Sequence, residues 1–227
     1  MEKIDKPETV NDSVAQIIKY DKGVIIDSFG EVRGKIEGLR FSFDKKSKTR
    51  IYSNYNDDRL NGIEKGYFMN GVLSYITNFR NDTVVGETFY YYPSGQIKTY
   101  EFNTFTFGQL IYQRKYDLNG KTIKSIGRGL IHFNQEKDSI KIGNEFYGVF
   151  ILAMPPKTKT YLMIADFTQD TIGVNHRIYE GGQERIYKEK FYKAGNIKKI
   201  IFWSIEDSLT KQVHKGHKVL DIYVKAK

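Results

Sequence analysis

The feature that most constrains this chain is a recurrence of glycine at a nearly fixed interval. In a first series, Gly38, Gly62 and Gly86 are evenly spaced, and Gly108 follows at a slightly shorter interval. A second series, Gly71, Gly95 and Gly120, recurs at almost the same interval and is offset from the first. A period of about 20 to 50 residues is typical of repeat architectures, in which each unit is one small motif. We therefore predict a stack of similar units over residues 38–130.

Each unit has the pattern of two strands joined by tight turns. In one of them an aromatic run ends at Tyr92, and Pro93-Ser94-Gly95 follows as a turn in which Pro presets φ and Gly supplies a positive φ. Residues 96–102 then alternate with a period of two, which indicates a β-strand. Asn70-Gly71 and Asn119-Gly120 occupy the same place in the neighbouring units and are strong hairpin signals.

These turns also carry a family resemblance. Residues Phe68 to Leu73 and Tyr92 to Ile97 share the pattern aromatic-x-x-Gly-x-aliphatic, and Tyr116 to Lys121 matches it in part. The pattern resembles the MORN repeat in its bacterial variant form, over residues 37–130. The resemblance implies an elongated single-layer antiparallel sheet of stacked β-hairpins. It also implies a link with scaffolding, tethering, lipid contact or antitoxin-like proteins, and it implies no particular reaction.

The regular glycine spacing ends after Gly129. Six strand-like runs follow, at residues 146–154, 160–167, 171–179, 185–192, 197–205 and 218–224. Short strands at this spacing suggest a small β-sandwich of immunoglobulin-like type, although the Cys pair of antibody domains is absent. Trp203 is predicted to lie in its core. Residues 206–213 are predicted to form a helical turn, with Asp207 or Ser208 as its cap.

The predicted organisation is therefore all-β and has four parts. They are a polar tail at residues 1–13, a MORN-like repeat sheet at 14–133, a linker at 134–143, and an immunoglobulin-like β-sandwich at 144–227. Residues 14–29 are expected to form a hairpin, split by Asp21-Lys22-Gly23, that closes the first edge of the repeat sheet. The C-terminal sandwich is expected to cap its other end, because a bare hairpin edge invites aggregation.

The sequence offers little catalytic chemistry. Cys is absent, which excludes disulfides and thiolate sites, and there are only four His. The one His pair, His214-x-x-His217, has Gly216 between its members and no third ligand nearby, so we interpret it as part of a loop. Gly-x-Ser-x-Gly and phosphate-binding loops are absent. The carboxylate pairs Asp57-Asp58 and Glu206-Asp207 are interpreted as solvated turn residues. We predict a non-enzymatic protein with no cofactor and no metal.

Aromatic residues make up 15% of the chain and are densest in the repeats. They are expected either to form structural ladders across the strands or to form a stripe that binds a partner. We expect another protein as the partner, and Tyr67, Tyr75, Tyr91 and Tyr100 are the candidate binding residues. The alternative is a glycan or small-ligand binder, or a glycan-acting enzyme, with a site between the two predicted domains. A further alternative is attachment to an envelope or membrane surface.

Charge and hydropathy narrow the class of partner. The net charge is +9, but the basic residues are spread along the chain rather than clustered, so nucleic acid is not an expected partner. The longest apolar stretch covers about eight residues, from Tyr147 to Met154, against about 20 for a membrane-spanning helix. The N-terminus has no apolar signal core. The cytoplasm therefore stays open as the location, as does the periplasm or cell surface if a leader has been removed.

Overall fold

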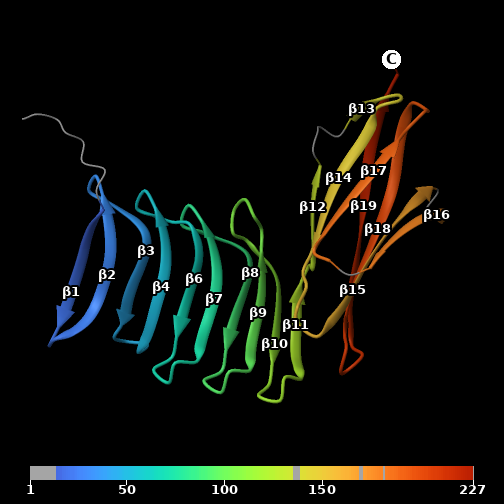
Figure 1. Cartoon of the computed structure of the whole chain (residues 1–227). Coiled ribbons are helices and arrows are strands. Elements are labelled where there is room, and N and C mark those ends of the chain that lie inside the picture. The colour runs from blue at the N-terminus through green and yellow to red at the C-terminus, as the bar shows by residue number, and fades with distance from the viewer. Residues whose placement is uncertain (1–13, 135–138, 169–170, 181, 227) are drawn as a thin grey trace, which may run out of the picture. The chain divides into compact units, whose positions relative to one another are not determined.

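The computed structural model describes residues 14–134, 139–168, 171–180 and 182–226, and these residues form an all-β protein. Antiparallel strands succeed one another along the chain, joined by short turns (Figure 1). By its internal contacts the chain divides into two compact units. The first unit comprises residues 1–97 and 105–108, and the second comprises residues 98–104 and 109–227.

The first unit is a single antiparallel sheet. Its hydrogen-bonded order is β1-β2-β3-β4-β6-β7-β8, with the short β5 paired to β4. The strands are β1 (Ala15–Asp21), β2 (Val24–Val32), β3 (Lys35–Asp44), β4 (Thr49–Asn56), β5 (Arg59–Leu60), β6 (Gly62–Tyr67), β7 (Leu73–Arg80) and β8 (Thr83–Tyr91). The predicted hairpin within residues 14–29 is confirmed, because β1 and β2 pair across the turn Lys22-Gly23.

Aspartates in two-residue turns join neighbouring hairpins of this unit. Asp58 and Asp82 both have positive φ, of 66°, in turns whose two central residues are left-handed. The Asp58 amide donates to the Ile36 carbonyl at 3.1 Å, and its Oδ1 accepts from the Ile36 amide at 2.7 Å. Asp82 makes the same pair of bonds to Leu60, at 2.9 and 2.8 Å. The two bond pairs are separated along the chain by the same interval as the first-series glycines, so the structure confirms the predicted period.

The turns at the other end of the hairpins repeat as well. In each, an amide donates back to the residue three positions earlier, at 2.8–3.0 Å: Gly71 to Phe68, Gly95 to Tyr92, and, in the second unit, Gly120 to Asp117. Each of these glycines has a positive φ, between 77° and 91°. The glycines of the second series thus recur because the same left-handed turn recurs.

The second unit contains strands from both halves of the chain. Its strands are β9 (Ile97–Asn103), β10 (Leu110–Tyr116), β11 (Thr122–Gly127), β12 (Leu130–Asn134), β13 (Ser139–Lys141), β14 (Glu145–Leu152), β15 (Thr158–Thr168), β16 (Thr171–Glu180), β17 (Glu184–Lys190), β18 (Gly195–Asp207) and β19 (Val213–Lys225). Strands β9, β10 and β11 pair in that order, a three-stranded sheet runs β12-β14-β17, and a five-stranded sheet runs β13-β19-β18-β15-β16. The six predicted C-terminal strands are β14 to β19.

The second observed unit begins earlier in the chain than the predicted sandwich domain. The last repeat hairpins, β9 to β11, group with the C-terminal strands rather than with the earlier repeats. The Tyr100 hydroxyl accepts a hydrogen bond from the Met154 amide at 2.9 Å, and the Ala153 amide donates to the Gly129 carbonyl at 2.7 Å. Within the segment 134–143, predicted as a linker, residues 139–141 form β13, which pairs in parallel with β19. Residues 135–138 of that segment and the predicted tail, 1–13, lie outside the described residues.

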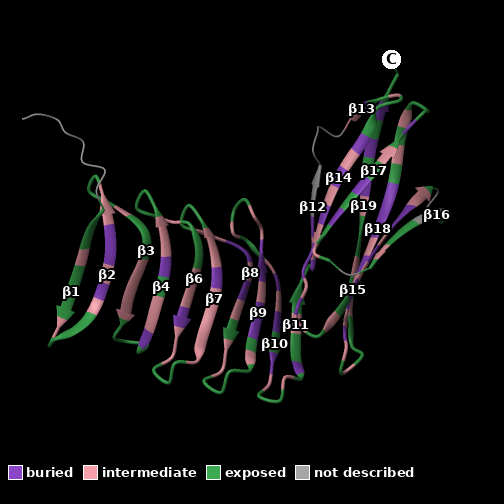
Figure 2. Cartoon of the chain, viewed as in Figure 1, coloured by how far each residue is buried: buried purple, intermediate pink, exposed green. Residues whose placement is uncertain are grey.

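The core of the second unit combines buried rings with buried aliphatic side chains, and Figure 2 shows the buried residues along its strands. Tyr100, Phe102 and Tyr112 have no exposed surface, and Trp203 is 6% exposed, as predicted. The Trp203 ring lies against the backbone of its cross-strand partner Gly216, where an added Cβ would come within 2.5 Å of the ring. Glycine is required there because only a residue without a side chain leaves room for the indole.

The predicted helical turn at residues 206–213 is wrong. Strand β18 continues to Asp207, a tight turn follows, and β19 begins at Val213. The Asp207 carboxylate accepts hydrogen bonds from the amides of Leu209 and Thr210, each at 2.9 Å. Aspartate therefore does bind free amides here, as a helix cap would, but the chain turns back into a strand instead of coiling.

We expect Asp82→Ala to lower the free energy of unfolding by about 1–3 kcal/mol. The substitution removes the acceptor for the Leu60 amide and places a less tolerant residue at a left-handed φ. Asp82→Asn keeps an acceptor oxygen and tolerates this φ, so it should cost less than half as much. Urea unfolding followed by far-UV circular dichroism compares the variants. Equal losses in both variants would show that the turn bond contributes nothing specific.

Candidate functional site

The four candidate tyrosines do not share one surface. Tyr67 and Tyr91 are half-buried and lie on the same side of the first unit's sheet, by strand pairing and alternation. Tyr75 lies on the opposite side, and its hydroxyl donates to Glu64 Oε1 at 2.8 Å. Tyr100 is fully buried in the second unit and offers no surface to a partner. The predicted residues therefore lie on both sides of one sheet and in the core of the other unit rather than on one common face.

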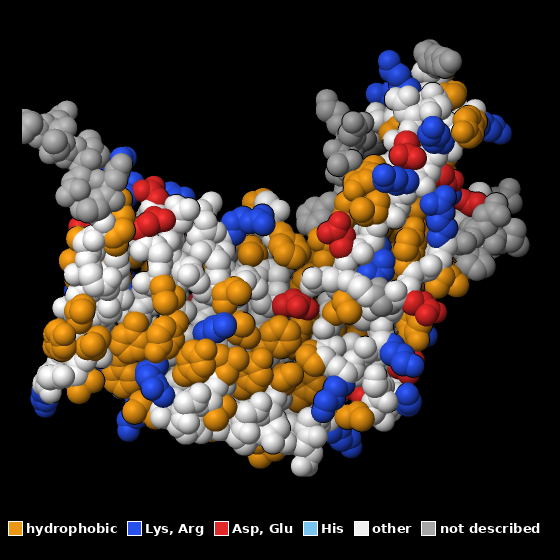
Figure 3. Space-filling model, viewed as in Figure 1, with side chains coloured by type: hydrophobic (Ala, Val, Ile, Leu, Met, Phe, Trp, Pro, Cys, Tyr) orange, Lys and Arg blue, Asp and Glu red, His pale blue; other side chains and the backbone are white. Residues whose placement is uncertain are grey.

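The side of the sheet that carries Tyr67 is lined by rings and aliphatic side chains, and we call it the aromatic face. Cross-strand pairing places one row on it, running Phe41, Tyr52, Lys65, Ile76 and Phe89. A second row runs Phe43, Arg50 and Tyr67. Leu39 and Ile63, on the same side by alternation, are 59% and 43% exposed. Figure 3 shows hydrophobic side chains gathered in a band across these strands.

The rings of the aromatic face contact one another. Tyr52 lies at the centre, with its ring centroid 5.3 Å from that of Phe41 and 5.8 Å from that of Tyr67. The second contact is edge-to-face, with an angle of 86° between the ring planes, which is a favourable geometry for aromatic pairs. Tyr52 nevertheless keeps 37% of its surface exposed. The ladder thus holds the rings in place and leaves part of each available.

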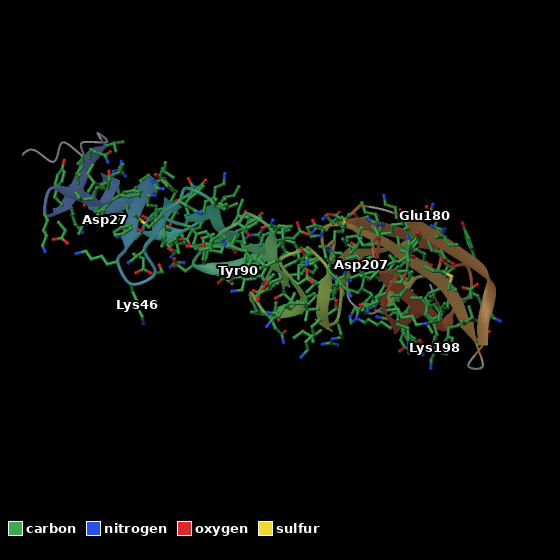
Figure 4. The ribbon with its side chains drawn as sticks, turned by 90° about the horizontal axis from the view of Figure 1, so that it is seen from below. Asp27, Lys46, Tyr90, Glu180, Lys198 and Asp207 are labelled. Atoms are coloured by element: carbon green, nitrogen blue, oxygen red, sulfur yellow. The ribbon has the colours of Figure 1, made fainter. Side chains whose placement is uncertain are left out.

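The opposite side of the sheet, which we call the polar face, satisfies its own polar groups. Arg40 donates two hydrogen bonds to Asp27, at 2.8 and 2.9 Å. The Thr77 and Thr88 hydroxyls are buried and hydrogen-bonded to each other at 2.6 Å. Asp27 and Tyr90, two members of the polar face, are labelled in Figure 4.

A chain of hydrogen bonds links three strands of the polar face. Glu64 accepts from the Ser53 hydroxyl at 2.6 Å and from the Tyr75 hydroxyl at 2.8 Å. Burial, together with the bond to the Glu64 carboxylate, raises the pKa of Tyr75 well above its ordinary value, so the phenol stays a donor. Burial alone would raise the pKa of Asp27, but the bonds and charge of Arg40, aided by Lys19, bring it below the ordinary value.

The two faces therefore differ in how their polar groups are arranged. The polar face also holds a ring pair, Tyr75 and Tyr90, with centroids 6.3 Å apart and Tyr90 39% exposed, but its charged and hydroxyl groups are closed in internal pairs. The aromatic face has a longer run of contacting rings with exposed aliphatic side chains beside it. Sequence reasoning missed Phe41, Tyr52, Arg50 and Lys65 as members of one surface. The alternation of period two in each strand could have shown which residues share a side of that strand. The sequence does not give the pairing partners and bulges, and these decide which sides of neighbouring strands form one face.

The second unit contains a buried ion pair, between Arg114 on β10 and Asp207 on β18. Their side chains are 2% and 6% exposed, with Nη1 and Oδ2 3.5 Å apart. Asp207 Oδ2 also accepts from the Thr122 hydroxyl at 2.5 Å, and Arg114 Nε donates to the Tyr112 hydroxyl at 3.0 Å. Burial acts to raise the pKa of Asp207, but the bonds from Thr122 and the turn amides, with the charge of Arg114, bring it below the ordinary value. The Asp207 carboxylate thereby joins β18 to Arg114 on β10 and to Thr122 on β11.

A second cluster lies between the two C-terminal sheets. Lys199 on β18 is 5% exposed and its Nζ lies 2.5 Å from Asp166 and 2.8 Å from Glu189. The ammonium also lies 6.0 Å from the Tyr187 ring centroid and 5.5 Å from that of Phe191. Both carboxylates are therefore committed to one cation, and the arrangement fastens β15, β17 and β18 together.

The two histidines of the His214-x-x-His217 motif face opposite sides of β19, because residues three apart on a strand do so. The His214 ring lies between Tyr112 and Trp203, at 5.2 and 5.4 Å, and one ring nitrogen is 2.9 Å from the Gly127 carbonyl oxygen. The His217 ring lies 5.9 Å from that of Phe202. Across the described ranges, no group of three or more His, Asp or Glu side chains is placed to hold a metal ion. Among those same residues, no helix has the length and apolarity needed to cross a bilayer.

We expect Asp207→Asn to flatten the pH dependence of stability below about pH 5. Because the folded pKa lies below the ordinary carboxyl value of about 4, the ionised Asp207 stabilises the fold at neutral pH, and this contribution is lost as pH falls through the folded pKa. At pH 7 the variant should be less stable by about 3 kcal/mol, because Arg114 is left buried without its partner charge.

Fluorescence of Trp203 during urea unfolding measures this effect, because it is the single Trp of the chain and lies in the second unit. Asp221→Asn is the matched control: Asp221 is exposed, and its carboxylate is 4.0 Å from Lys198. Equal behaviour of the two variants would contradict a special role for Asp207.

No family model matches this chain, and no curated protein is significantly similar to it.

Proposed function

We propose that this protein is a non-enzymatic binding protein that presents the aromatic face of its first unit to a protein partner. The observation that carries the proposal is the difference between the two sides of one sheet. One side pairs its polar groups internally, and the other holds a contacting set of rings that remain partly exposed.

Exposed rings in fixed positions suit a binding surface. Contiguous apolar area on a soluble protein favours a site of interaction, and Tyr is enriched where partners are bound because it adds contact area with little loss of freedom. The Tyr52 ring is already oriented by Phe41 and Tyr67, so binding would cost little side-chain entropy. Repeat sheets also offer the extended surfaces that recognise other chains.

The charged clusters support a role without catalysis. Asp207, Lys199 and Glu64 are each engaged in contacts that join strands, and these contacts account for their positions. A catalytic group would instead be expected to face a cleft with a perturbed pKa and an unoccupied neighbour.

We expect Tyr52→Ala to abolish retention of the partner in pull-downs from lysate and envelope fractions with the intact chain as bait. Loss of a central aromatic contact typically costs about 2 kcal/mol or more, which is about 30-fold in affinity. Tyr90→Ala is the matched control, because Tyr90 is 39% exposed against 37% for Tyr52 but lies on the polar face. Circular dichroism and thermal unfolding verify that both variants are folded.

A partner that both variants retain equally would contradict the use of the aromatic face. If the intact chain captures no protein but binds immobilised glycans, the glycan-binding alternative replaces the proposal.

A further inference from the structure

Within the two rows of the aromatic face, the charged side chains are cations. They are Arg50 and Lys65. Outside these rows, alternation also puts Lys35, Glu37, Arg80 and Glu87 on this side of the sheet. Arg50 lies directly opposite Phe43 on one side and Tyr67 on the other. Lys65 lies between Tyr52 and Ile76. Both cations therefore stand among rings and aliphatic groups.

Neither cation has a carboxylate within ion-pair distance in the part of the chain that the structure describes. The cations of the polar face differ in this respect, since Arg40 and Lys19 both pair with Asp27. A charge among apolar side chains is costly to leave unpaired. Among the described residues, Arg50 and Lys65 therefore stand without a carboxylate partner, whereas Arg40 and Lys19 share one.

The Arg50 guanidinium shows this most clearly. Its Nε is buried and has no hydrogen-bond partner, and its Nη2 makes only a long contact, at 3.5 Å, with the Phe68 carbonyl oxygen. A buried donor is costly to leave without an acceptor. The Nη1 group makes no hydrogen bond to any described residue and is not buried, so a carboxylate approaching this face would reach the guanidinium there, and guanidinium groups bind carboxylates with well-matched geometry.

We propose that the partner segment recognised by the aromatic face is acidic as well as apolar, and that Arg50 and Lys65 receive its Asp or Glu side chains. This inference rests on the proposed function and adds the chemical class of the partner. The partner's apolar side chains would lie against Tyr52 and its neighbouring rings. Its carboxylates would neutralise the two cations and exclude partners of the opposite charge.

A protein segment fits this surface better than an anionic membrane does. Recognition of anionic lipid by charge typically requires a cluster of about four to eight Lys or Arg. Here two cations stand at separate positions within the face, each beside a ring, which suits discrete carboxylates spaced along a chain. We therefore commit to a protein segment, and vesicle binding becomes an outcome of the test.

The test uses the intact chain to select from a displayed library of short random peptides. We expect the selected peptides to combine Asp or Glu with aromatic or aliphatic residues. One such peptide is then synthesised with a fluorescent label, and its affinity is measured by anisotropy. Lys65→Glu should weaken binding at least tenfold, and Arg50→Gln should weaken it several-fold. Raising the salt concentration should weaken binding to the unmodified chain.

Lys46→Glu is the matched control for charge. It makes the same change in net charge as Lys65→Glu, but Lys46 is exposed in the turn between β3 and β4 and extends away from the sheet (Figure 4). It should leave the affinity within about twofold. A reversed selection adds a gain of function: peptides selected on the Lys65→Glu chain should carry Lys or Arg in place of acidic residues.

The outcomes separate this inference from the proposed function. Peptides without acidic residues that bind Lys65→Glu normally, but lose binding to Tyr52→Ala, would overturn the inference and leave the aromatic face as the binding surface. Peptides that bind both Lys65→Glu and Tyr52→Ala normally, or no enrichment at all, would overturn the inference, with the partner pull-down still deciding the function. Sedimentation with phosphatidylglycerol vesicles that depends on Lys65, without any peptide enrichment, would overturn it in favour of a lipid surface.

Discussion

A sheet of one layer has no second layer to cover either of its sides, and this constraint governs the first unit. A sandwich hides one side of each sheet, but here every side chain must be stabilised by its neighbours on the same face. The two sides meet this requirement differently. One uses small hydroxyls, ion pairs and a shared carboxylate, as in the contact of Thr77 with Thr88. The other uses rings in contact, as in that of Tyr52 with Phe41 and Tyr67.

The second unit meets the same constraint by adding layers. Its repeat-like strands β9 to β11 bury their tyrosines, and Tyr100 hydrogen-bonds to the backbone at Met154. Tyrosine therefore has two roles in one chain. Where further strands pack onto the sheet it becomes core, and where they do not it stays at the surface. This distinction separates Tyr100 from Tyr67, although the two stand in similar sequence patterns.

Much of the fold was predictable from local sequence, and much of the site was not. The repeat period, the hairpins and the six C-terminal strands follow from glycine turns and alternation, which are short-range signals. The grouping of β9 to β11 with the C-terminal strands depends on contacts such as that of Arg114 with Asp207, which lie far apart in the sequence. The composition of the aromatic face depends on register, and the resemblance to MORN repeats stays a prediction about family. Asp207 misled the sequence reasoning because a carboxylate that binds free amides can end a strand turn as well as begin a helix.

The aspartate turns have a consequence for how this chain can vary in length. Asp58 binds Ile36 on β3 and Asp82 binds Leu60 on β5, so these two junctions between hairpins use the same local bonds. Whole repeat units can therefore be duplicated or lost while the junctions and both faces keep their chemistry. Insertion of a single residue within a strand would instead exchange the two faces from that point to the next turn, bringing rings among the hydroxyls and cations among the ion pairs. Evolution of such a chain is expected to proceed in complete hairpin pairs, and the extent of its binding surface is set by how many it retains.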